Sequence, residues 1–310
     1  MKKKSAILGV LIFMALLLMM GCGQNAEELH RQTRAEKARL DSLDKAALKV
    51  GVMPTLDCMP IYVAKETHLF DTLGVDVHLK WYSAQMDCDT ALLRGRVEGA
   101  VTDLVRASYM SHNKGLSLQY PITTVAYWQL LSNRKARVTE LKQLSDKMIA
   151  ITRHSATDML ADMAIDSVRP KYEVYRVQIN DVRIRLKMLL NNEMDAMLLT
   201  EPQATQARLA GHPVLMDSRD KDLQFGVVAF RSKVLKDSRR QKQLALFLKA
   251  YNMAVDSLNA RGLKHYAPIL KKYCDTDDKT IAAIPRVRFQ YAHSPRQKDL
   301  AKANGAVEKK

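Results

Sequence analysis

The chain has 310 residues, which suits two domains or one two-lobed domain with ample room for a hydrophobic core. Its formal net charge of +16 could indicate nucleic acid or an anionic membrane surface as a partner. The basic residues are scattered along the chain and form no single stripe. We therefore expect no nucleic-acid partner and interpret the charge as a solvated surface that faces anionic headgroups.

The first 22 residues have the layout of a bacterial secretory signal. Residues 2–4 are lysines, residues 6–21 form an apolar run, and Cys22 follows the small residue Gly21. This arrangement resembles a lipoprotein signal, which implies a signal peptide over 1–21 and lipid on Cys22. A single membrane-spanning anchor is the alternative, although the run is short for one. In both cases the remainder lies outside the cytoplasm, anchored at the cell envelope and facing the periplasm or the exterior.

Residues 22–46 are polar and have the composition of a helix. They contain too few apolar positions for a buried face, so we interpret them as a tether between the membrane and the body. A helix packed on the body is the alternative, because Leu40, Leu43 and Leu48 recur at wide spacing.

The body begins with alternating strand and helix patterns. We expect strands at 48–52, 75–81 and 98–102, and helices at 61–70 and through 91–95. The same rhythm restarts with strands at 147–151, 173–177, 195–199 and 225–230, and helices at 159–168, 182–190 and 244–258. Repeated strand-helix-strand units predict an α/β fold with mostly parallel sheets that are flanked by helices.

The order of these units predicts two lobes that the chain enters in turn. We expect lobe 1 to begin over 47–130, lobe 2 to span 131–225, and the chain to return to lobe 1 over 226–292, with a loose tail over 293–310. The apolar stretches at 122–131 and 225–230 are the natural crossovers between the lobes.

Three segments of the body resemble periplasmic substrate-binding proteins of ABC transporters, of the nitrate, sulfonate and thiamine-precursor type. They are 64–77, with the phrase Leu-Phe-Asp-Thr-Leu-Gly-Val-Asp-Val, the lead-in to the second lobe at 138–150, and 192–202, which ends in Asp-Ala-Met-Leu-Leu-Thr-Glu-Pro. The resemblance covers most of 48–260 through the order and spacing of these segments.

This resemblance implies a two-lobed type II periplasmic-binding-protein fold with the ligand held between the lobes. It also implies a small-molecule ligand and delivery to an ABC permease in the membrane; we expect a monomer without a cofactor. Ligands of open α/β sheets bind beyond the carboxyl ends of the strands, which places the candidate site residues on the loops that follow the strands.

In lobe 1 the candidates for ligand contact follow three successive strands. They are Thr55, Asp57, Met59, Ser83, Ala84, Gln85 and Asp103. Helix capping is the alternative role for Asp57, Ser83 and Asp103.

In lobe 2 and the first crossover the candidates are Trp128, Ser155, Ala156, Thr157 and Glu201. Ser155 and Thr157 lie at a helix start, where N–H groups and hydroxyls favour an anion or a carbonyl oxygen. Capping is again the alternative for these two, and a place in the core is the alternative for Trp128.

Three cysteines remain besides Cys22, an odd number for an oxidising compartment. Cys58 and Cys88 follow consecutive strands, so a disulfide at the rim of the cleft is one interpretation. Two unpaired, partly buried thiols are another, and a soft-metal site is a minor third, although we expect no metal.

The sequence carries no Gly-x-Ser-x-Gly, Gly-x-Gly-x-x-Gly, His-Glu-x-x-His or Walker loop, so we expect a binding protein rather than an enzyme. A cofactor-biosynthesis enzyme on the same two-lobed fold and a ligand-sensing lipoprotein are the alternatives. Asp57, Asp103 and Glu201 would suit a cationic ligand, whereas the helix starts and the basic background would suit an anion.

Overall fold

The structure is a computed structural model that describes residues 31 and 33–308, and it divides into one unit over 1–47 and a second over 48–310. The predicted signal peptide and Cys22 lie outside the described residues. In the first unit, residues 33–46 form a helix on which Leu40 and Leu43 are exposed. Within the described part of the chain, no helix combines the length and the apolar character that a membrane span requires.

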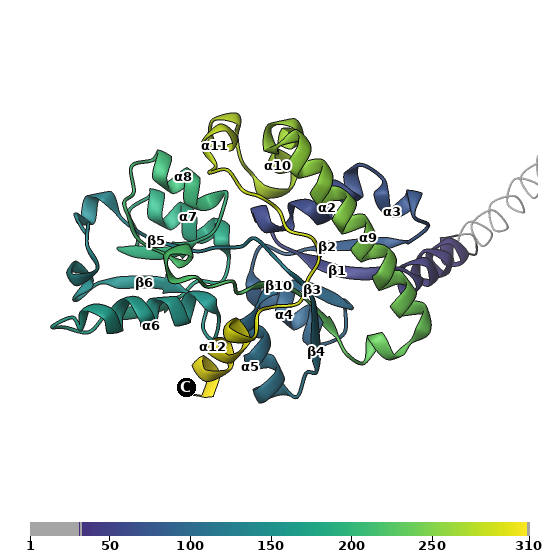
Figure 1. Cartoon of the computed structure of the whole chain (residues 1–310), viewed down its shortest axis with the longest axis horizontal. Coiled ribbons are helices and arrows are strands. Elements are labelled where there is room, and N and C mark those ends of the chain that lie inside the picture. The colour runs from purple at the N-terminus through teal and green to yellow at the C-terminus, as the bar shows by residue number, and fades with distance from the viewer. Residues whose placement is uncertain (1–30, 32, 309–310) are drawn as a thin grey trace, which may run out of the picture. The chain divides into compact units, whose positions relative to one another are not determined.

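The second unit contains two five-stranded sheets, one in each lobe (Figure 1). The lobe 1 sheet has the order β2-β1-β3-β10-β4, with bounds Val77–Trp81, Leu48–Val52, Gly99–Asp103, Gly226–Arg231 and Leu118–Thr123. The lobe 2 sheet has the order β7-β6-β8-β5-β9, with bounds Tyr175–Gln178, Met148–Ile151, Ala196–Leu199, Gln129–Ser132 and Val214–Asp217.

Four strands of each sheet run in one direction and one strand runs against them. In lobe 1 the reversed strand is β10, which is antiparallel to both of its neighbours. In lobe 2 it is β5, which is antiparallel to β8 and β9. These two strands each come directly after the chain has crossed between the lobes, which explains their reversed direction. The predicted α/β architecture of two mostly parallel lobes is confirmed.

Two connections join the lobes, one over 124–128 between β4 and β5, and one over 218–225 between β9 and β10. They lie close together: the Thr124 backbone N–H donates to the Gly226 carbonyl at 2.8 Å. A Cβ on Gly226 would stand 2.2 Å from Thr124 Oγ1, so only glycine fits this approach. The crossover predicted at 122–131 thus extends too far at both ends, into β4 and β5. The one predicted at 225–230 is wrong, because 226–231 form β10 and the connection precedes this strand.

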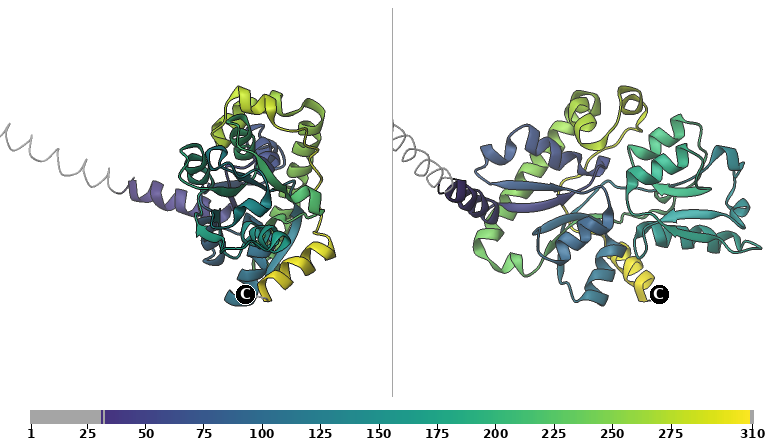
Figure 2. Two further views of the ribbon diagram at one scale, coloured as in Figure 1. Left: turned by 90° about the vertical axis from the view of Figure 1, so that its left-hand side faces the viewer. Right: turned by 180° about the vertical axis from the view of Figure 1, so that it is seen from behind.

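Helices cover both sheets (Figures 1 and 2). In lobe 1 they are α2 (Met59–Glu66), α3 (Leu69–Thr72), α4 (Gln85–Leu93), α5 (Leu104–Lys114), α9 (Ser238–Arg261), α10 (Ala267–Cys274) and α11 (Asp278–Ala283). In lobe 2 they are α6 (Ala156–Val168), α7 (Val182–Leu190) and α8 (Gln203–Leu209). Short 3-10 helices are η1 (Leu56–Cys58), η2 (Arg134–Ala136), η3 (Leu141–Leu144), η4 (Ser218–Lys221), η5 (Val234–Lys236) and η6 (Leu263–Tyr266).

Side-chain caps fix the starts of the helices that border the cleft. Asp103 caps α5, Ser155 caps α6 and Asp181 caps α7, each by accepting a backbone N–H from the first turn. Asp103 and Ser155 lie at or just beyond the carboxyl ends of β3 and β6, and both line the space between the lobes.

The expected loose tail is wrong for residues 297–308, which form helix α12 (Gln297–Glu308). Asp299 and Ala303 of this helix are buried, and Ala303 packs in a cluster with Leu104 of α5 and Met159 of α6. The sequence does not indicate this helix clearly, because most of its apolar residues are small and a charged residue, Asp299, is among its buried positions.

Candidate functional site

A pocket lies between the two lobes, at the carboxyl ends of the strands. Lobe 1 contributes Met53, Thr55, Asp57, Gln85, Val101, Thr102 and Asp103 to its lining. Lobe 2 contributes Thr152, Ser155, Thr157, Val182, Arg185 and Thr200, and the first crossover contributes Ala126 and Trp128. The space open to the centre of a water molecule is about 50 Å³. Most of the polar groups in the lining are hydroxyls, and the lining also contains two carboxyls and one guanidinium.

Asp103 connects the two lobes at this pocket. Its Oδ1 accepts the backbone N–H of Arg106 at 2.8 Å within lobe 1, and that of Ala156, the first residue of α6 in lobe 2, at 2.9 Å. Burial raises the pKa of Asp103 to about 7, against the opposing effect of these two backbone N–H groups. The nearby Asp89 carboxyl raises the pKa further, whereas the Arg106 charge lowers it.

Asp57 is the second buried carboxyl of the lining. Its Oδ2 accepts the hydroxyl of Thr124 at 3.0 Å, so the first loop is held against the crossover. Burial raises the pKa of Asp57, and the hydroxyls of Thr55 and Thr124 oppose this shift. The two carboxyls, Asp57 and Asp103, make the lobe 1 wall of the pocket a hydrogen-bond acceptor.

A buried ion pair supports this wall from behind. Arg106 Nε donates to Asp89 Oδ2 at 2.7 Å, and both side chains are buried. Arg106 Nη1 also donates to the Arg153 carbonyl of lobe 2 at 3.3 Å. Burial raises the pKa of Asp89, and the charge of Arg106 lowers it. Arg106 thus has its charge matched by Asp89 and takes part in the contact between the lobes.

Arg185 is the charged group of the lobe 2 wall. It comes from α7, is only 6% exposed, and donates from Nη1 to the Leu198 carbonyl at 2.9 Å. Burial lowers the pKa of Arg185 to about 10, so the guanidinium still carries its charge at neutral pH. Its Nε has no hydrogen-bond partner among the described residues, and neither does Oγ1 of Thr152 on the same wall.

The loop between β2 and α4 closes the pocket against α7. Ser83 Oγ donates to Asp181 Oδ2, and the backbone N–H groups of Val182 and Gln85 donate across the lobes to Ser83 and Asn180, each at 3.3 Å. Asp181 also caps α7. The lobes are therefore in direct contact along this edge.

The first loop of lobe 1 makes a second such edge with the start of α8. The Leu56 backbone N–H donates to the Glu201 carbonyl at 2.8 Å, and Gln203 Nε2 donates to the Pro54 carbonyl at 2.8 Å. With contacts on both sides of the pocket, the structure represents a closed arrangement of the two lobes.

Seven of the predicted site residues line the pocket: Thr55, Asp57, Gln85, Asp103, Trp128, Ser155 and Thr157. Three more, Ser83, Ala84 and Ala156, contact the opposite lobe through their backbone or hydroxyl groups. Their roles in ligand binding stay predictions.

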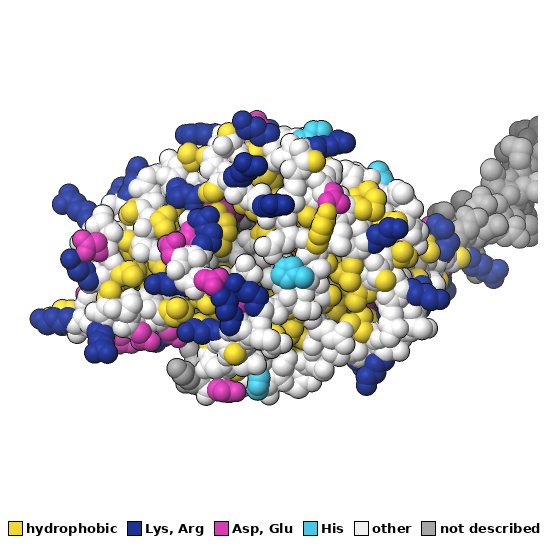
Figure 3. Space-filling model, in the orientation of Figure 1, with side chains coloured by type: hydrophobic (Ala, Val, Ile, Leu, Met, Phe, Trp, Pro, Cys, Tyr) yellow, Lys and Arg dark blue, Asp and Glu magenta, His cyan; other side chains and the backbone are white. Residues whose placement is uncertain are grey.

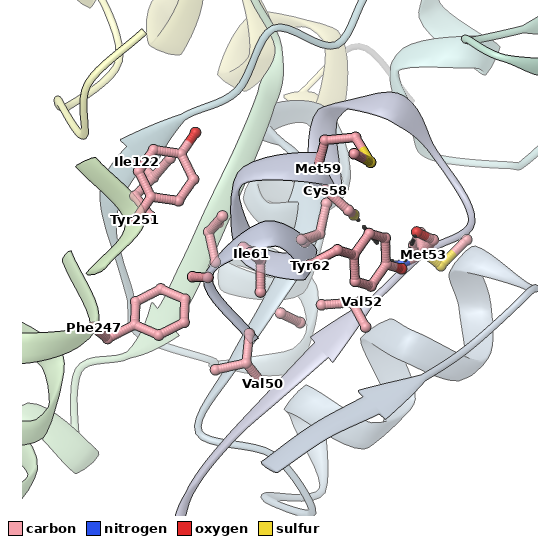
Figure 4. Packing of buried hydrophobic residues seen from close by; sticks show 14 of the residues in the cluster. Val50, Val52, Met53, Cys58, Met59, Ile61, Tyr62, Ile122, Phe247 and Tyr251 are labelled. Carbon is pink, nitrogen blue, oxygen red and sulfur yellow. Dashed lines mark hydrogen bonds between the residues drawn. The ribbon is translucent and has the colours of Figure 1, made fainter. Parts of the chain in front are cut away.

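The last two predicted site residues, Met59 and Glu201, also lie outside the lining. Met59 is buried in the core of lobe 1, where it packs beside Ile61 and Tyr62 (Figure 4). The Glu201 carboxylate is occupied within lobe 2, since it accepts from Tyr127 and Arg208, each at 2.8 Å, and from Thr205. The Glu201 carboxylate therefore stabilises the start of α8 and does not face the pocket.

Several lining residues were not predicted from the sequence. Thr102, Thr152 and Thr200 lie at or just beyond the ends of β3, β6 and β8, so the rule that ligands bind beyond strand ends could have identified them. Arg185 gave no such signal, because it lies in the middle of a helix among other basic residues.

The possible disulfide between Cys58 and Cys88 is absent from the structure: both residues are unpaired and buried, as is Cys274. Cys58 Sγ accepts the backbone N–H of Met53 at 3.4 Å (Figure 4), whereas Cys88 Sγ faces the Val101 carbonyl at 3.7 Å. The two sulfur atoms thus face different partners, Met53 just after β1 and Val101 within β3, in agreement with the alternative of two unpaired thiols. The described residues contain no cluster of three or more His, Cys, Asp or Glu side chains that could hold a metal ion.

The basic surplus lies on the surface. Figure 3 shows Lys and Arg side chains dispersed over the visible face, with Asp and Glu among them and no continuous basic stripe. The charge pattern on this face matches the expectation of a solvated surface.

Solved structures with this fold are numerous. The ligand-binding component of an ABC-type import system from Staphylococcus aureus, with zinc bound, matches with a TM-score of 0.69 and 15% identity, over 85% of this chain and 91% of that chain. The aliphatic sulphonate binding protein SsuA from Escherichia coli matches with a TM-score of 0.67 and 15% identity, over 84% of this chain and 90% of that chain. The nitrate-binding protein NrtA from Synechocystis PCC 6803 matches with a TM-score of 0.65 and 14% identity, over 76% and 68% of the two chains.

At these identities the likeness shows a shared fold, the periplasmic-binding-protein fold. No curated protein matches the sequence. A family model described as NMT1/THI5-like matches residues 55–259, which is more than half of the chain and agrees with the resemblance drawn from 64–77, 138–150 and 192–202. The chain therefore belongs to the NMT1/THI5-like family.

Proposed function

We propose that this protein is a lipid-anchored, extracytoplasmic solute-binding protein that captures a small molecule between its lobes and delivers it to an ABC importer. Hinge closure is the mechanism: contacts from both lobes act on the ligand together only when the lobes are shut. No covalent chemistry is required.

The observation that carries this proposal is a pocket whose polar walls come from different lobes. Asp57 and Asp103 lie on one wall, and Ser155, Thr157 and Arg185 lie on the other. A ligand between these walls would stabilise the closed arrangement by as much as it prefers that arrangement over an open one. The fold shared with binding components of import systems supports the same role.

Capture can be tested by native mass spectrometry of the full chain extracted from bacterial membranes in mild detergent. The expected spectrum contains a small molecule bound in a one-to-one ratio, whose addition to the stripped protein raises the unfolding temperature. A spectrum with the bare chain alone, together with no stabilisation by any fraction of a metabolite extract, would contradict the proposal.

Lipid anchoring rests on the apolar run before Cys22 and on the tether over 22–46. Cells grown with an alkyne-tagged fatty acid should label the protein, and Cys22→Ala should abolish the label and release the chain from the membrane fraction. Cys274→Ala is the matched control, because Cys274 is buried in the described body and should remain without effect on labelling. Labelling that persists in Cys22→Ala would rule out this anchor.

Delivery requires a permease partner. In vesicles that contain the cognate permease and ATPase, the liganded chain should accelerate ATP hydrolysis and the stripped chain should not. The rival function, a cofactor-biosynthesis enzyme on the same fold, is separated by the fate of the bound compound. A binding protein returns it unchanged after prolonged incubation, whereas an enzyme returns a product of different mass.

A further inference from the structure

The lobe 2 wall of the pocket carries the positive charge of Arg185, which interacts electrostatically with the Asp181 carboxylate at the start of α7. Arg185 forms no ion pair among the described residues, and its hydrogen bonding is limited to the Leu198 carbonyl, with Nε unpartnered. A buried guanidinium is costly unless an anion or further acceptors compensate for its lost hydration. An oxyanion on the ligand would provide that compensation.

Thr152 adds a second unsatisfied donor to the same wall. It is only 1% exposed, and its Oγ1 has no hydrogen-bond partner among the described residues. Buried hydroxyls are rarely left unpaired in folded proteins. Arg185 therefore requires an acceptor and Thr152 requires a hydrogen-bond partner, which an acceptor can also provide, and both residues line the pocket between the lobes.

The lobe 1 wall of the pocket carries hydrogen-bond acceptors instead of a positive charge. Asp57 and Asp103 are 6% and 5% exposed, and among the described residues their hydrogen-bond partners are hydroxyl and backbone N–H groups, while the Arg106 guanidinium acts on Asp103 only through its charge. Two carboxyls on this wall would repel a simple anion, whereas a protonated amine would form charge-assisted hydrogen bonds with them.

The start of α6, which the sequence suggested as an anion site, is already occupied in the closed arrangement. Its first backbone N–H, that of Ala156, donates to Asp103, and Ser155 caps the next N–H at 3.1 Å. This helix start therefore supports the lobe contact, and Arg185 is the group of the lining that remains for a negative charge.

The size of the pocket limits the ligand. Its volume open to the centre of a water molecule is about 50 Å³. On this measure one water needs about 10 to 15 Å³, so the space corresponds to roughly three to five water-sized groups. Compounds of about the size of the smallest amino acids fit this limit, whereas sugars and peptides exceed it.

We propose that the pocket binds a compact zwitterion, with its oxyanion at Arg185 and Thr152 in lobe 2 and its protonated amine at Asp57 and Asp103 in lobe 1. This inference rests on the proposed solute-binding function and names the class of solute. The ligand itself then joins the two lobes, because each of its charges is matched by a different wall.

Calorimetric titration of the full chain with matched sets of three compounds tests the assignment. Each set contains a zwitterion, its deaminated acid and its decarboxylated amine: glycine, acetate and methylamine; 3-aminopropanoate, propanoate and ethylamine; 4-aminobutanoate, butanoate and propylamine. Nitrate, ethanesulfonate and a neutral aminopyrimidine complete the panel. At least one zwitterion should bind at least tenfold more tightly than both of its single-charge counterparts and all three additional probes.

Tighter binding of any single-charge or neutral probe would overturn the zwitterion assignment and leave the proposed function intact. Failure of every zwitterion to bind would also overturn it. If native mass spectrometry additionally finds no bound small molecule, the proposed function fails as well, so the two failures are distinguishable.

Two variants test whether the two walls bind the two charges of the zwitterion. Arg185→Gln and Asp57→Asn should each weaken binding of the zwitterion at least tenfold, and Asp57→Asn should narrow the preference for it over the deaminated acid. Lys187→Gln on the same helix and Asp87→Asn on α4 are matched controls, because both side chains are exposed and neither lines the pocket. Unfolding temperatures of the unliganded variants identify any that fail to fold. Unchanged binding in Asp57→Asn, the more conservative of the two, would contradict the assignment.

Discussion

The carboxylate of Asp103 in lobe 1 accepts the backbone N–H of Ala156 in lobe 2 at 2.9 Å. The same oxygen caps the start of α5 through Arg106. One side chain thus serves two helix starts, one from each lobe, and the second contact exists only while the lobes are shut. The closed arrangement therefore depends on a buried ionisable group at the edge of the pocket.

Asp103 should make stability pH-dependent. Burial raises the pKa of its carboxyl from 3.8 to about 7, so its contribution to stability is fully present below about pH 4 and is lost as the pH rises through about 7. Asp103→Asn keeps an acceptor oxygen and removes the titration. The free energy of unfolding of this variant, relative to the parent, should therefore increase between about pH 5 and about pH 8 in urea titrations.

Asp89, Arg106 and Asp57 near Asp103 also carry ionisable groups. The free energy of unfolding must therefore be compared between parent and variant at each pH. Parallel pH profiles for the two proteins would contradict the raised pKa of Asp103.

Ser83→Ala should loosen the contact between the β2–α4 loop and α7. The variant removes the hydrogen bond from Ser83 Oγ to Asp181 but leaves the capping of α7 by Asp181 in place. A loss of about 1 kcal/mol would shift the closed population roughly fivefold. Backbone N–H groups of Gln85 and Val182, which donate across the lobes, should exchange hydrogen faster by mass spectrometry.

Ser117→Ala is the matched control, because Ser117 donates to Ser232 within lobe 1 at an exposed position. It should leave exchange at 83–86 and 180–184 unchanged. Equal exchange in both variants would show that Ser83 does not hold the lobes together.

Gly226→Ala should destabilise the crossover. Its Cβ would stand 2.2 Å from Thr124 Oγ1 and 2.6 Å from the Ala126 Cβ, so both connections between the lobes would have to shift. We expect a loss of about 1 to 3 kcal/mol in the free energy of unfolding. Gly305→Ala is the control, since its Cβ meets nothing within 4 Å and helix α12 should gain up to about 1 kcal/mol. A neutral result at Gly226 would refute the close approach of the two connections.

Arg106→Ala should be among the most destabilising substitutions in lobe 1. It leaves the Asp89 carboxylate buried without its ion-pair partner, which typically costs about 3 to 5 kcal/mol. Adding Asp89→Asn to this variant should recover part of the loss, as chemical denaturation would show. The exposed residue Lys142, paired with Glu140, provides the control, and Lys142→Ala should leave the unfolding midpoint unchanged. Equal losses in the single and double variants would argue against the buried charge as the cause.

Cys58, Cys88 and Cys274 should not react with a thiol reagent in the native protein. All three are buried, and burial raises the pKa of each thiol, so neither access nor thiolate is available. In denaturant without reductant, all three should react. A mass two hydrogens lower, with only one of the three reactive, would instead reveal a disulfide.

Much of the fold could be predicted from the sequence, because the apolar residues of its strands and helices recur with a clear period. The alternation over 75–81 and the stripes at 159–168 and 182–190 each predicted an element that the structure contains. Strand β9 was missed because it is only four residues long and partly exposed. Helix α12 was missed because most of its apolar residues are small and the charged residue Asp299 is among its buried positions.

The site was predictable where it depends on strand ends and not where it depends on contacts across the chain. Asp57, Asp103, Ser155 and Thr157 follow strands, and all four line the pocket. Glu201 also follows a strand, but its carboxylate pairs with Arg208 and accepts a hydrogen bond from Tyr127. The local sequence around Glu201 does not indicate these partners.

The central claim is that two lobes close on a small molecule, and the distance between them tests it most directly. Spin labels at the exposed positions Lys114 in lobe 1 and Glu193 in lobe 2 would report this distance by pulsed electron resonance in the full chain. With the most stabilising compound of the panel bound, we expect one narrow distance distribution at the spacing of the closed structure. After its removal, we expect a broader distribution at longer distances. Identical distributions in the two conditions would contradict closure on a ligand.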